Sequence, residues 1–194
     1  MTRALTEAEA IEHDRAYREG WKLTEGELLL AGARLSPAPG WFAKRRLARA
    51  IACFEAALRI NPGGWPSHWA LGKIHQRLGR KEEALRCFAR AHELAPVQPD
   101  VAREAGITAA DLGDGPGAVR FLEAAIAASP ADGGLQSNLA LAHLLCGDVA
   151  AARAAVERAA ALLPEDAIVR KVQGVVEDVA SGRRPQPRTL EEMR

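Results

Sequence analysis

The stretch WALGKIHQRLGRKEEALRCFARAHELAP, which runs from Trp69 to Pro96, decides how the chain folds. Its second half carries one apolar stripe at helical spacing, formed by Ala84, Leu85, Phe88 and Ala91. Gly79 lies before this helix, where a glycine takes a positive φ at little cost, and Pro96 lies after it, where a proline stops a helix. The stretch therefore predicts two helices joined by a tight turn.

The same features return at a period of 34 residues, which is typical of a helical repeat. The prolines in this series are Pro62, Pro96, Pro130 and Pro164. Alanines, large apolar residues and glycines keep the same period: Ala57, Ala91, Ala125 and Ala159; Ala50, Ala84, Ala118 and Ala152; Phe54, Phe88, Leu122 and Val156; Gly79, Gly113 and Gly147; Gly72, Gly106 and Gly174, with Ala140 between the last two. Because a glycine inside a helix costs about 1 kcal/mol relative to alanine, Gly72 and Gly106 predict a close approach between helices.

In this register the chain resembles the tetratricopeptide repeat family, most strongly over Trp65–Pro96. The matching residues there are Leu71, Gly72, Gly79, Ala84, Phe88, Ala91 and Pro96. The resemblance implies an all-α fold, in which antiparallel helix pairs stack into a right-handed superhelical solenoid with a concave groove. The family often has a tyrosine between the two glycines, and here that place holds His75, Ala109 and His143. Packing inside the repeats is therefore expected to be less aromatic.

The expected repeats lie at 65–98, 99–132 and 133–164. A degenerate repeat is expected before them, with an N-terminal helical segment at 1–35, a proline- and glycine-containing loop at 36–42 and a second helix at 43–62. After the repeats we expect a capping helix at 165–181, because the last repeat of a solenoid otherwise leaves an apolar face in water. The composition of the basic tail at 182–194 predicts disorder, with a docking tail as the alternative.

Capping boxes divide the N-terminal segment. Thr6 with Glu9 predicts a helix over Glu7–Leu23, and Thr24 with Glu27 predicts the first helix of the degenerate repeat over Glu25–Leu35. One continuous helix from Glu7 to Leu35 is the alternative.

Composition and motifs give no indication of an enzyme. The formal net charge is +1, so there is no general case for a nucleic acid or an anionic membrane as partner. No apolar run approaches the roughly 20 residues that span a bilayer, and the first residues lack the apolar centre of a signal peptide, so a cytoplasmic location is expected. The three cysteines match no zinc motif, and His68 and His75 lie about 10 Å apart along one helix. We therefore expect no catalytic residue, metal or cofactor.

The resemblance implies that the first helix of each pair lines the groove. The residues expected there by helical spacing are Trp69, Lys73, Gln76, Arg77, Arg103, Ile107, Ala110, Asp111, Ser137, Leu141, Leu144, Leu145, Lys171 and Val175. For Leu144 and Leu145, packing against the neighbouring repeat is the alternative. Some family members bind the C-terminal carboxylate of chaperone peptides through groove asparagines, but those places hold Lys73, Ile107 and Leu141, which argues against that function.

The expected groove has a basic, aromatic end and an aliphatic end. Such a surface suits an amphipathic helix or an extended segment with an acidic part and apolar anchors. The sequence therefore predicts a non-enzymatic interaction module, an adaptor or scaffold, that binds a protein or peptide partner. Two alternatives are a homo-oligomeric assembly protein and a chaperone or accessory subunit for a specific client.

Overall fold

The computed structural model describes residues 4–28 and 38–193 of the chain. In this part of the chain there are nine α-helices, one short 3-10 helix and no strand. The helices belong to two compact units, Met1–Ala95 and Pro96–Arg194. The predicted all-α class is confirmed.

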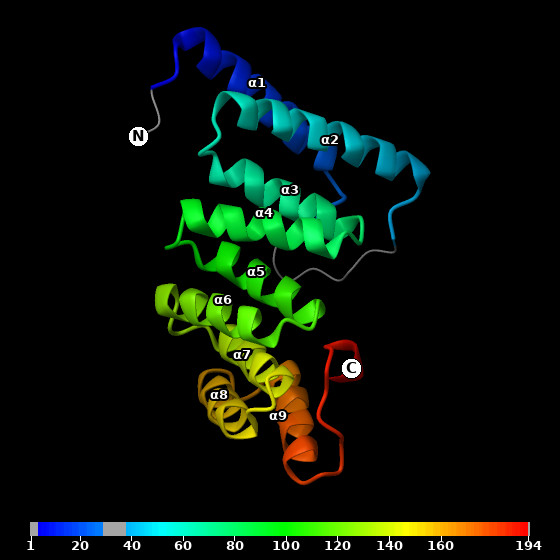
Figure 1. Cartoon of the computed structure of the whole chain (residues 1–194), viewed down its shortest axis with the longest axis vertical. Helices are drawn as coiled ribbons and strands as arrows, with labels where there is room; N and C mark the ends of the chain where they lie inside the picture. Colours follow the sequence, from blue (N-terminus) through cyan, green and yellow to red (C-terminus); the bar gives the residue numbers. More distant parts are fainter. Residues whose placement is uncertain (1–3, 29–37, 194) are drawn as a thin grey trace. The chain divides into compact units, whose positions relative to one another are not determined.

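The first unit consists of two helix pairs. Its helices are α1 (Glu7–Thr24), α2 (Trp41–Ile60), α3 (Trp65–Arg77) and α4 (Lys81–Leu94). Helix α1 packs along α2, and α3 packs along α4 (Figure 1). Helix α2 also contacts α3, so the two pairs share one core.

The second unit has two helix pairs and a final helix. Its helices are α5 (Pro99–Asp111), α6 (Gly115–Ala128), α7 (Gly133–Leu145), α8 (Val149–Leu162) and α9 (Ala167–Ala180), followed by the 3-10 helix η1 (Glu191–Met193). Helix α5 pairs with α6, and α7 pairs with α8. Helix α9 covers α8 and also contacts α7, which in turn contacts α5. The first helices α5, α7 and α9 are therefore neighbours on one side of this unit.

Turn glycines and aspartates set the ends of these helices. Gly79, Gly113 and Gly147 have φ values of 74°, 78° and 76°, which glycine adopts without the steric cost that other residues have. Aspartate side chains then cap the next helix through its free backbone N–H groups. The carboxylate of Asp148, for example, accepts a hydrogen bond from the backbone N–H of Ala151 at 2.9 Å. The three period-34 turns therefore share their glycine, whereas only the turns at Gly113 and Gly147 add an aspartate cap, because Arg80 follows Gly79 and its side chain does not cap α4.

The helical glycines lie where two helices approach closely. A Cβ atom at Gly72 would lie 2.5 Å from the ring of Phe88, and one at Gly106 would lie 2.6 Å from the side chain of Leu122. A Cβ atom at Gly174 would have nothing within 4 Å. The close approach predicted for the first two positions is confirmed, but Gly174 lies on a face of α9 without such a neighbour.

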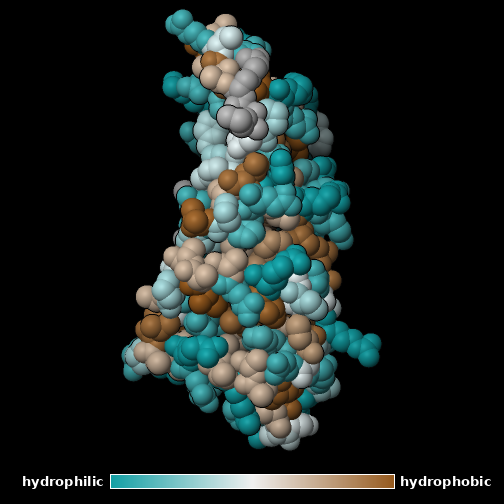
Figure 2. Space-filling model, turned by 60° about the vertical axis from the view of Figure 1, so that its left-hand side comes forward, coloured by the Kyte–Doolittle hydropathy of each residue, from teal (hydrophilic) through white to brown (hydrophobic). Residues whose placement is uncertain are grey.

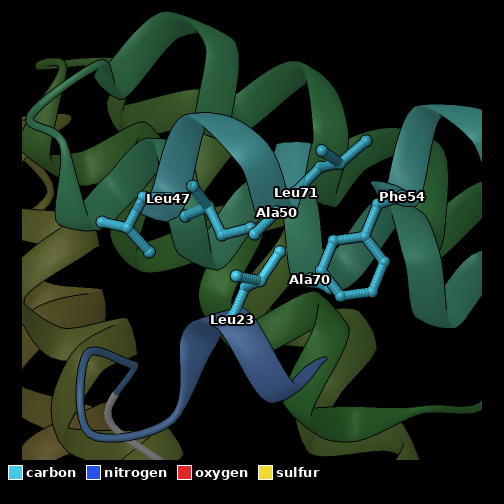
Figure 3. Close-up of a cluster of buried hydrophobic side chains, with 7 residues drawn as sticks. Leu23, Leu47, Ala50, Phe54, Ala70 and Leu71 are labelled. Atoms are coloured by element: carbon cyan, nitrogen blue, oxygen red, sulfur yellow. The ribbon is translucent and has the colours of Figure 1, made fainter. Parts of the chain in front are cut away.

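The core of the first unit joins its first three helices. Figure 3 shows Leu23 of α1 beside Leu47, Ala50 and Phe54 of α2, together with Ala70 and Leu71 of α3. Phe54 and Leu47 are fully buried. This packing makes α1 the partner of α2.

The N-terminal segment differs from its expected form. The capping box of Thr6 and Glu9 is present, but α1 ends at Thr24. The hydroxyl of Thr24 donates to the backbone oxygen of Trp21 at 2.7 Å instead of capping a following helix, and Gly26 has a φ of 73°. Residues 25–28 thus form a turn and bend, and both the continuous helix Glu7–Leu35 and a helix beginning at Glu25 are wrong.

The place in the first pair that was expected for Glu25–Leu35 is taken by α1, because α1 is the helix that packs along α2. The rest of that expected helix and the first part of the expected loop, residues 29–37, lie outside the described residues. Helix α2 begins at Trp41, two residues before the start that the sequence predicted.

Candidate functional site

The neighbouring helices α5, α7 and α9 carry the part of the expected groove that lies in the second unit. Ile107, Asp111, Leu141 and Leu145 are half-buried there, and Lys171 is exposed. Val175 is buried, with 7% of its surface exposed. The face therefore presents aliphatic side chains between polar ones. On the side of the molecule drawn in Figure 2, apolar (brown) and hydrophilic (teal) residues likewise alternate in small groups.

Besides Val175, three residues expected in the groove are buried. Ser137 is 4% exposed, Ala110 is 3% exposed and Leu144 is fully buried. The reason for Ser137 and Leu144 is that α7 contacts four helices, α5, α6, α8 and α9, so little of its surface is left uncovered. The prediction that Ser137 lines the groove is therefore wrong. Leu144 is buried by packing, as the alternative for this residue predicted.

Arg103 does not present a free positive charge. Its guanidinium forms an ion pair with Asp100 at 2.8 Å and a second one with Asp132. Asp132 also caps α7, because its other oxygen accepts from the backbone N–H groups of Gly134 and Leu135. Arg103 thus ties α5 to the start of α7, and its charge is balanced within the fold.

An open groove lies between α7 and α9. Its lining from these two helices, which we call the α7–α9 groove, consists of Leu141, Ile168, Lys171, Val172 and Val175. The remaining lining residues are Leu190 and Met193 of the C-terminal tail, and the open volume is about 220 Å³. The groove is mainly aliphatic, with one lysine at its edge.

The tail after α9 is ordered against this face, so the expected disorder of 182–194 is wrong for the residues that the structure describes. The tail runs back alongside α9 (Figure 1, red). The side-chain amide of Gln186 donates to the backbone oxygen of Leu144 at the end of α7. Two apolar residues, Leu190 and Met193, follow the basic part of the tail. Met193 is 5% exposed, and its burial holds the tail against this face.

In the first unit, the expected groove residues are Trp69, Lys73, Gln76 and Arg77, and all four are half-buried. Trp69 packs against Trp21 of α1, with ring centroids 6.1 Å apart. Arg77 forms an ion pair with Glu27 at 3.5 Å, and Glu27 also pairs with Arg46 at 2.9 Å. These aromatic and basic side chains are therefore partly engaged in the fold itself.

The remaining titratable groups have surroundings that suit packing. Burial lowers the pKa of His75 and raises the pKa of the Cys53, Cys87 and Cys146 thiols. A raised pKa keeps a thiol protonated, and the protonated form is a poor nucleophile. Among the residues with described positions, no group of three or more His, Cys, Asp or Glu side chains could hold a metal ion. In the same part of the chain, no helix has the length and apolar character needed to cross a membrane.

Sequence reasoning missed several residues of these sites. Trp21 lies before the repeats, so the 34-residue period gives no signal for it. Ile168 and Val172 lie on α9 beside Lys171 and Val175, and their apolar character at helical spacing is the signal that could have indicated them. Leu190 and Met193 follow a stretch rich in arginine and proline, whose composition predicts disorder. Their spacing of three residues, around two glutamates, is the signal that indicates a short amphipathic turn.

Comparison with known proteins identifies the repeats. Two family models described as "Tetratricopeptide repeat" match residues 65–96 and residues 109–175. No curated protein matches the chain in sequence.

Solved structures of low sequence identity share the fold. One, "Crystal structure of MamA protein", has a TM-score of 0.73 at 15% identity, over 95% of this chain and 91% of that one. Another, "MamA 41-end from Desulfovibrio magneticus RS-1", has a TM-score of 0.68 at 17% identity, over 92% and 88%. A third, YrrB, has a TM-score of 0.64 at 17% identity, over 78% of each chain, and is described as "a TPR protein with an unusual peptide-binding site".

Proposed function

We propose that this chain, which belongs to the tetratricopeptide repeat family, is a non-enzymatic interaction module that binds a segment of a protein partner on the face of α5, α7 and α9. Repeats of this fold generally serve as scaffolds, since stacked first helices offer an extended surface for a peptide. YrrB, which is described as having a peptide-binding site, is a protein of the same fold.

The observation that carries the proposal is the α7–α9 groove. Its aliphatic lining includes Val172 and Val175, the exposed Lys171 lies beside them, and two apolar side chains of the tail, Leu190 and Met193, complete the lining. Apolar pockets with a charged rim are the usual anchoring sites of protein interfaces. A partner segment with apolar anchors and an acidic flank therefore suits this groove.

The partner chemistry differs from the one expected from Arg103 and Arg77. Both guanidiniums already pair with carboxylates of the fold, so Lys171 is the basic group that we assign to the partner. This difference decides which substitutions probe the groove. Leu141→Glu with Lys171→Glu alters the groove, whereas Arg103→Glu would also break the contacts between α5 and α7.

A displayed library of random peptides, selected on the full chain, tests the proposal. We expect recovered peptides to bind the Leu141→Glu, Lys171→Glu variant at least tenfold more weakly in fluorescence anisotropy, because a carboxylate replaces an apolar contact and repels an acidic flank. The matched control is Val97→Glu with Lys44→Glu, which makes the same charge change at exposed positions outside the groove. Equal affinity for wild type and the groove variant would disprove the proposed site, provided that circular dichroism shows both to be folded.

Self-assembly is a second candidate function, favoured by one observation in the first unit. Trp41 and Phe42 at the start of α2 are 61% and 81% exposed, and their rings contact each other with centroids 4.7 Å apart. Arg45 lies over the Trp41 ring at 5.0 Å. Neighbouring exposed aromatic side chains are enriched at interfaces, so a second copy of the chain is the candidate partner for this surface.

A further inference from the structure

The tail after α9 adds two apolar side chains to the lining of the α7–α9 groove. Leu190 and Met193 lie three residues apart around η1, and residues at that spacing in a 3-10 helix point to the same side. Both line the groove together with Val172 and Val175. The intervening residues, Glu191 and Glu192, are exposed. This turn is amphipathic, with its apolar side toward the groove.

Among the described residues of the tail's last part, the side chains of Pro187 and Met193 are buried, and a small set of hydrogen bonds adds to their packing. Gln186 donates to the backbone oxygen of Leu144, which already accepts from the backbone N–H of Gly147 at 3.0 Å. The backbone N–H of Arg188 donates to the carboxylate of Glu192 at 2.7 Å, within the tail. Segments with few buried contacts open locally at low free-energy cost. Another peptide segment can therefore replace the tail on α7 and α9 at low free-energy cost.

Because the tail is covalently attached to α9, it can stay bound to α7 and α9 even if its intrinsic affinity for them is low. Ten residues, 181–190, separate the end of α9 at Ala180 from the turn at Glu191. A short tether gives an effective concentration in the millimolar range, so a segment of low intrinsic affinity can still occupy the groove most of the time. A partner that binds in trans must then compete with it.

We propose that residues 186–193 are an intramolecular ligand of the α7–α9 groove, and that a partner segment of the same chemistry displaces them. The partner segment has two large apolar side chains three residues apart in a helical turn, with carboxylates between them. This inference rests on the proposed function, since it names the ligand class of the same groove. It also assigns the tail a regulatory part, because the partner segment gains the contacts that Leu190 and Met193 now make with α7 and α9 only when the tail leaves them.

The test uses the full chain and a fluorescein-labelled synthetic peptide of sequence QPRTLEEMR, which is that of residues 186–194. The variant Leu190→Ser with Met193→Ser removes both anchors of the tethered tail and leaves the groove intact. If the tail occupies the groove nine-tenths of the time, wild type has about tenfold lower apparent affinity than its free groove. We therefore expect the variant to bind the peptide about tenfold more tightly than wild type does.

Two controls accompany this comparison. Val97→Ser, at an exposed apolar residue outside the groove, should bind the peptide as wild type does. Adding Leu141→Glu to the anchor variant should abolish binding. Equal affinity of wild type and the anchor variant, or no binding to the anchor variant, would overturn the inference.

A second measurement leaves the tail sequence unchanged and covers the case in which the anchor variant does not fold. Leu141→Glu should release the tail, so the amides of Arg188 and Met193, which are hydrogen-bonded, should lose protection in hydrogen exchange. Val97→Glu should leave them protected. Tail amides that exchange in wild type at the rate of an unstructured peptide would contradict the inference.

The two proposals fail in different ways. If library-selected peptides bind the groove and QPRTLEEMR does not, the proposed function stands and the tail is not its ligand. If neither kind of peptide responds to groove substitutions, both proposals are wrong.

Discussion

At the scale of single residues, glycine is required in the repeat where two helices approach too closely for a side chain. Gly106 faces Leu122 at a distance that a methyl group could not occupy, and Gly174, at the equivalent register of α9, faces open space. The same residue type at the same period therefore has opposite consequences for stability. Whether a helix follows to pack on that face makes the difference.

Gly106→Ala should lower the free energy of unfolding by about 1–3 kcal/mol, because the new methyl group overlaps Leu122 and the backbone of Ala118. Gly174→Ala should raise it by up to about 1 kcal/mol, since alanine is the better helix former and meets nothing there. Urea denaturation followed by circular dichroism measures both. Changes of the same sign would show that close packing does not explain the glycine period.

Arg103 is the second residue whose role depends on its surroundings. It pairs with Asp100 and with the helix cap Asp132 while it is 22% exposed. Arg103→Ala should lower the free energy of unfolding by about 1 kcal/mol, and Arg90→Ala, which breaks an exposed i,i+3 pair with Glu93, by a few tenths. Urea titration of the two variants tests this order. An equal loss would mean that the Arg103 pairs do not tie α5 to α7.

At the scale of elements, α3 carries two histidines that favour the neutral form. Burial lowers the pKa of His68 and of His75, and the positive charges of Arg90 near the first and Arg80 near the second act in the same direction. When the folded pKa lies below the usual value of about 6.5, both states are neutral at higher pH and stability is complete. As the pH falls below 6.5 the unfolded chain binds more protons, and stability declines until the folded histidines titrate too.

The free energy of unfolding should therefore fall between pH 7.5 and pH 5.5, by at most about 1.4 kcal/mol per pH unit for each histidine. The Nδ1 atom of His75 is buried and has no hydrogen-bond partner among the described residues. His68→Gln with His75→Phe should flatten the dependence in this range, as measured by urea denaturation at each pH. A dependence that is unchanged in the double variant would assign it to other groups.

The helical period predicted the elements of the repeats better than those at the ends. Spacing of apolar residues and turn glycines is local information, and it located α3 to α9. The prediction of a helix beginning at Glu25 was wrong because it required Thr24 as the N-cap. The hydroxyl of Thr24 instead donates a hydrogen bond to the backbone oxygen of Trp21 in α1. The prediction of a disordered tail was wrong because the tail packs on residues of α7 and α9. The composition of the tail itself carries no information about those residues.

The candidate site was predictable to the same extent. Helical spacing placed Leu141 on the first helix of its pair and Lys171 on the last helix, and both line the α7–α9 groove. It did not predict that Ser137 is buried, because that depends on how many helices surround α7. The partner of Arg103 is 29 residues away along the chain, so its neutralised charge could not be read from its own helix.

At the scale of the whole molecule, the net charge is close to zero, so the choice of partner should depend on short-range contacts. Lys plus Arg is 26 and Asp plus Glu is 25, so long-range attraction does not favour either sign of partner. Binding on the face of α5, α7 and α9 should then depend weakly on salt, and its specificity should come from the spacing of apolar anchors.

Self-assembly is tested on the whole chain by light scattering over a concentration series. If Trp41 and Phe42 form an interface, the average mass should rise with concentration in wild type and stay that of a monomer in Trp41→Ser with Phe42→Ser. Ile11→Ser with Val97→Ser, two other exposed apolar residues, is the control. A monomer at all concentrations in wild type would remove this second function.

The central claim is that the α7–α9 groove binds a partner segment in exchange for the tail. Methyl NMR spectra of the full chain, titrated with a library-selected peptide, test it most directly. We predict shifts of the Leu141, Val172 and Val175 methyl groups, together with a change of Leu190 and Met193 toward the shifts of an unstructured chain. Saturating binding that leaves these five residues unchanged and shifts methyl groups elsewhere would contradict the account.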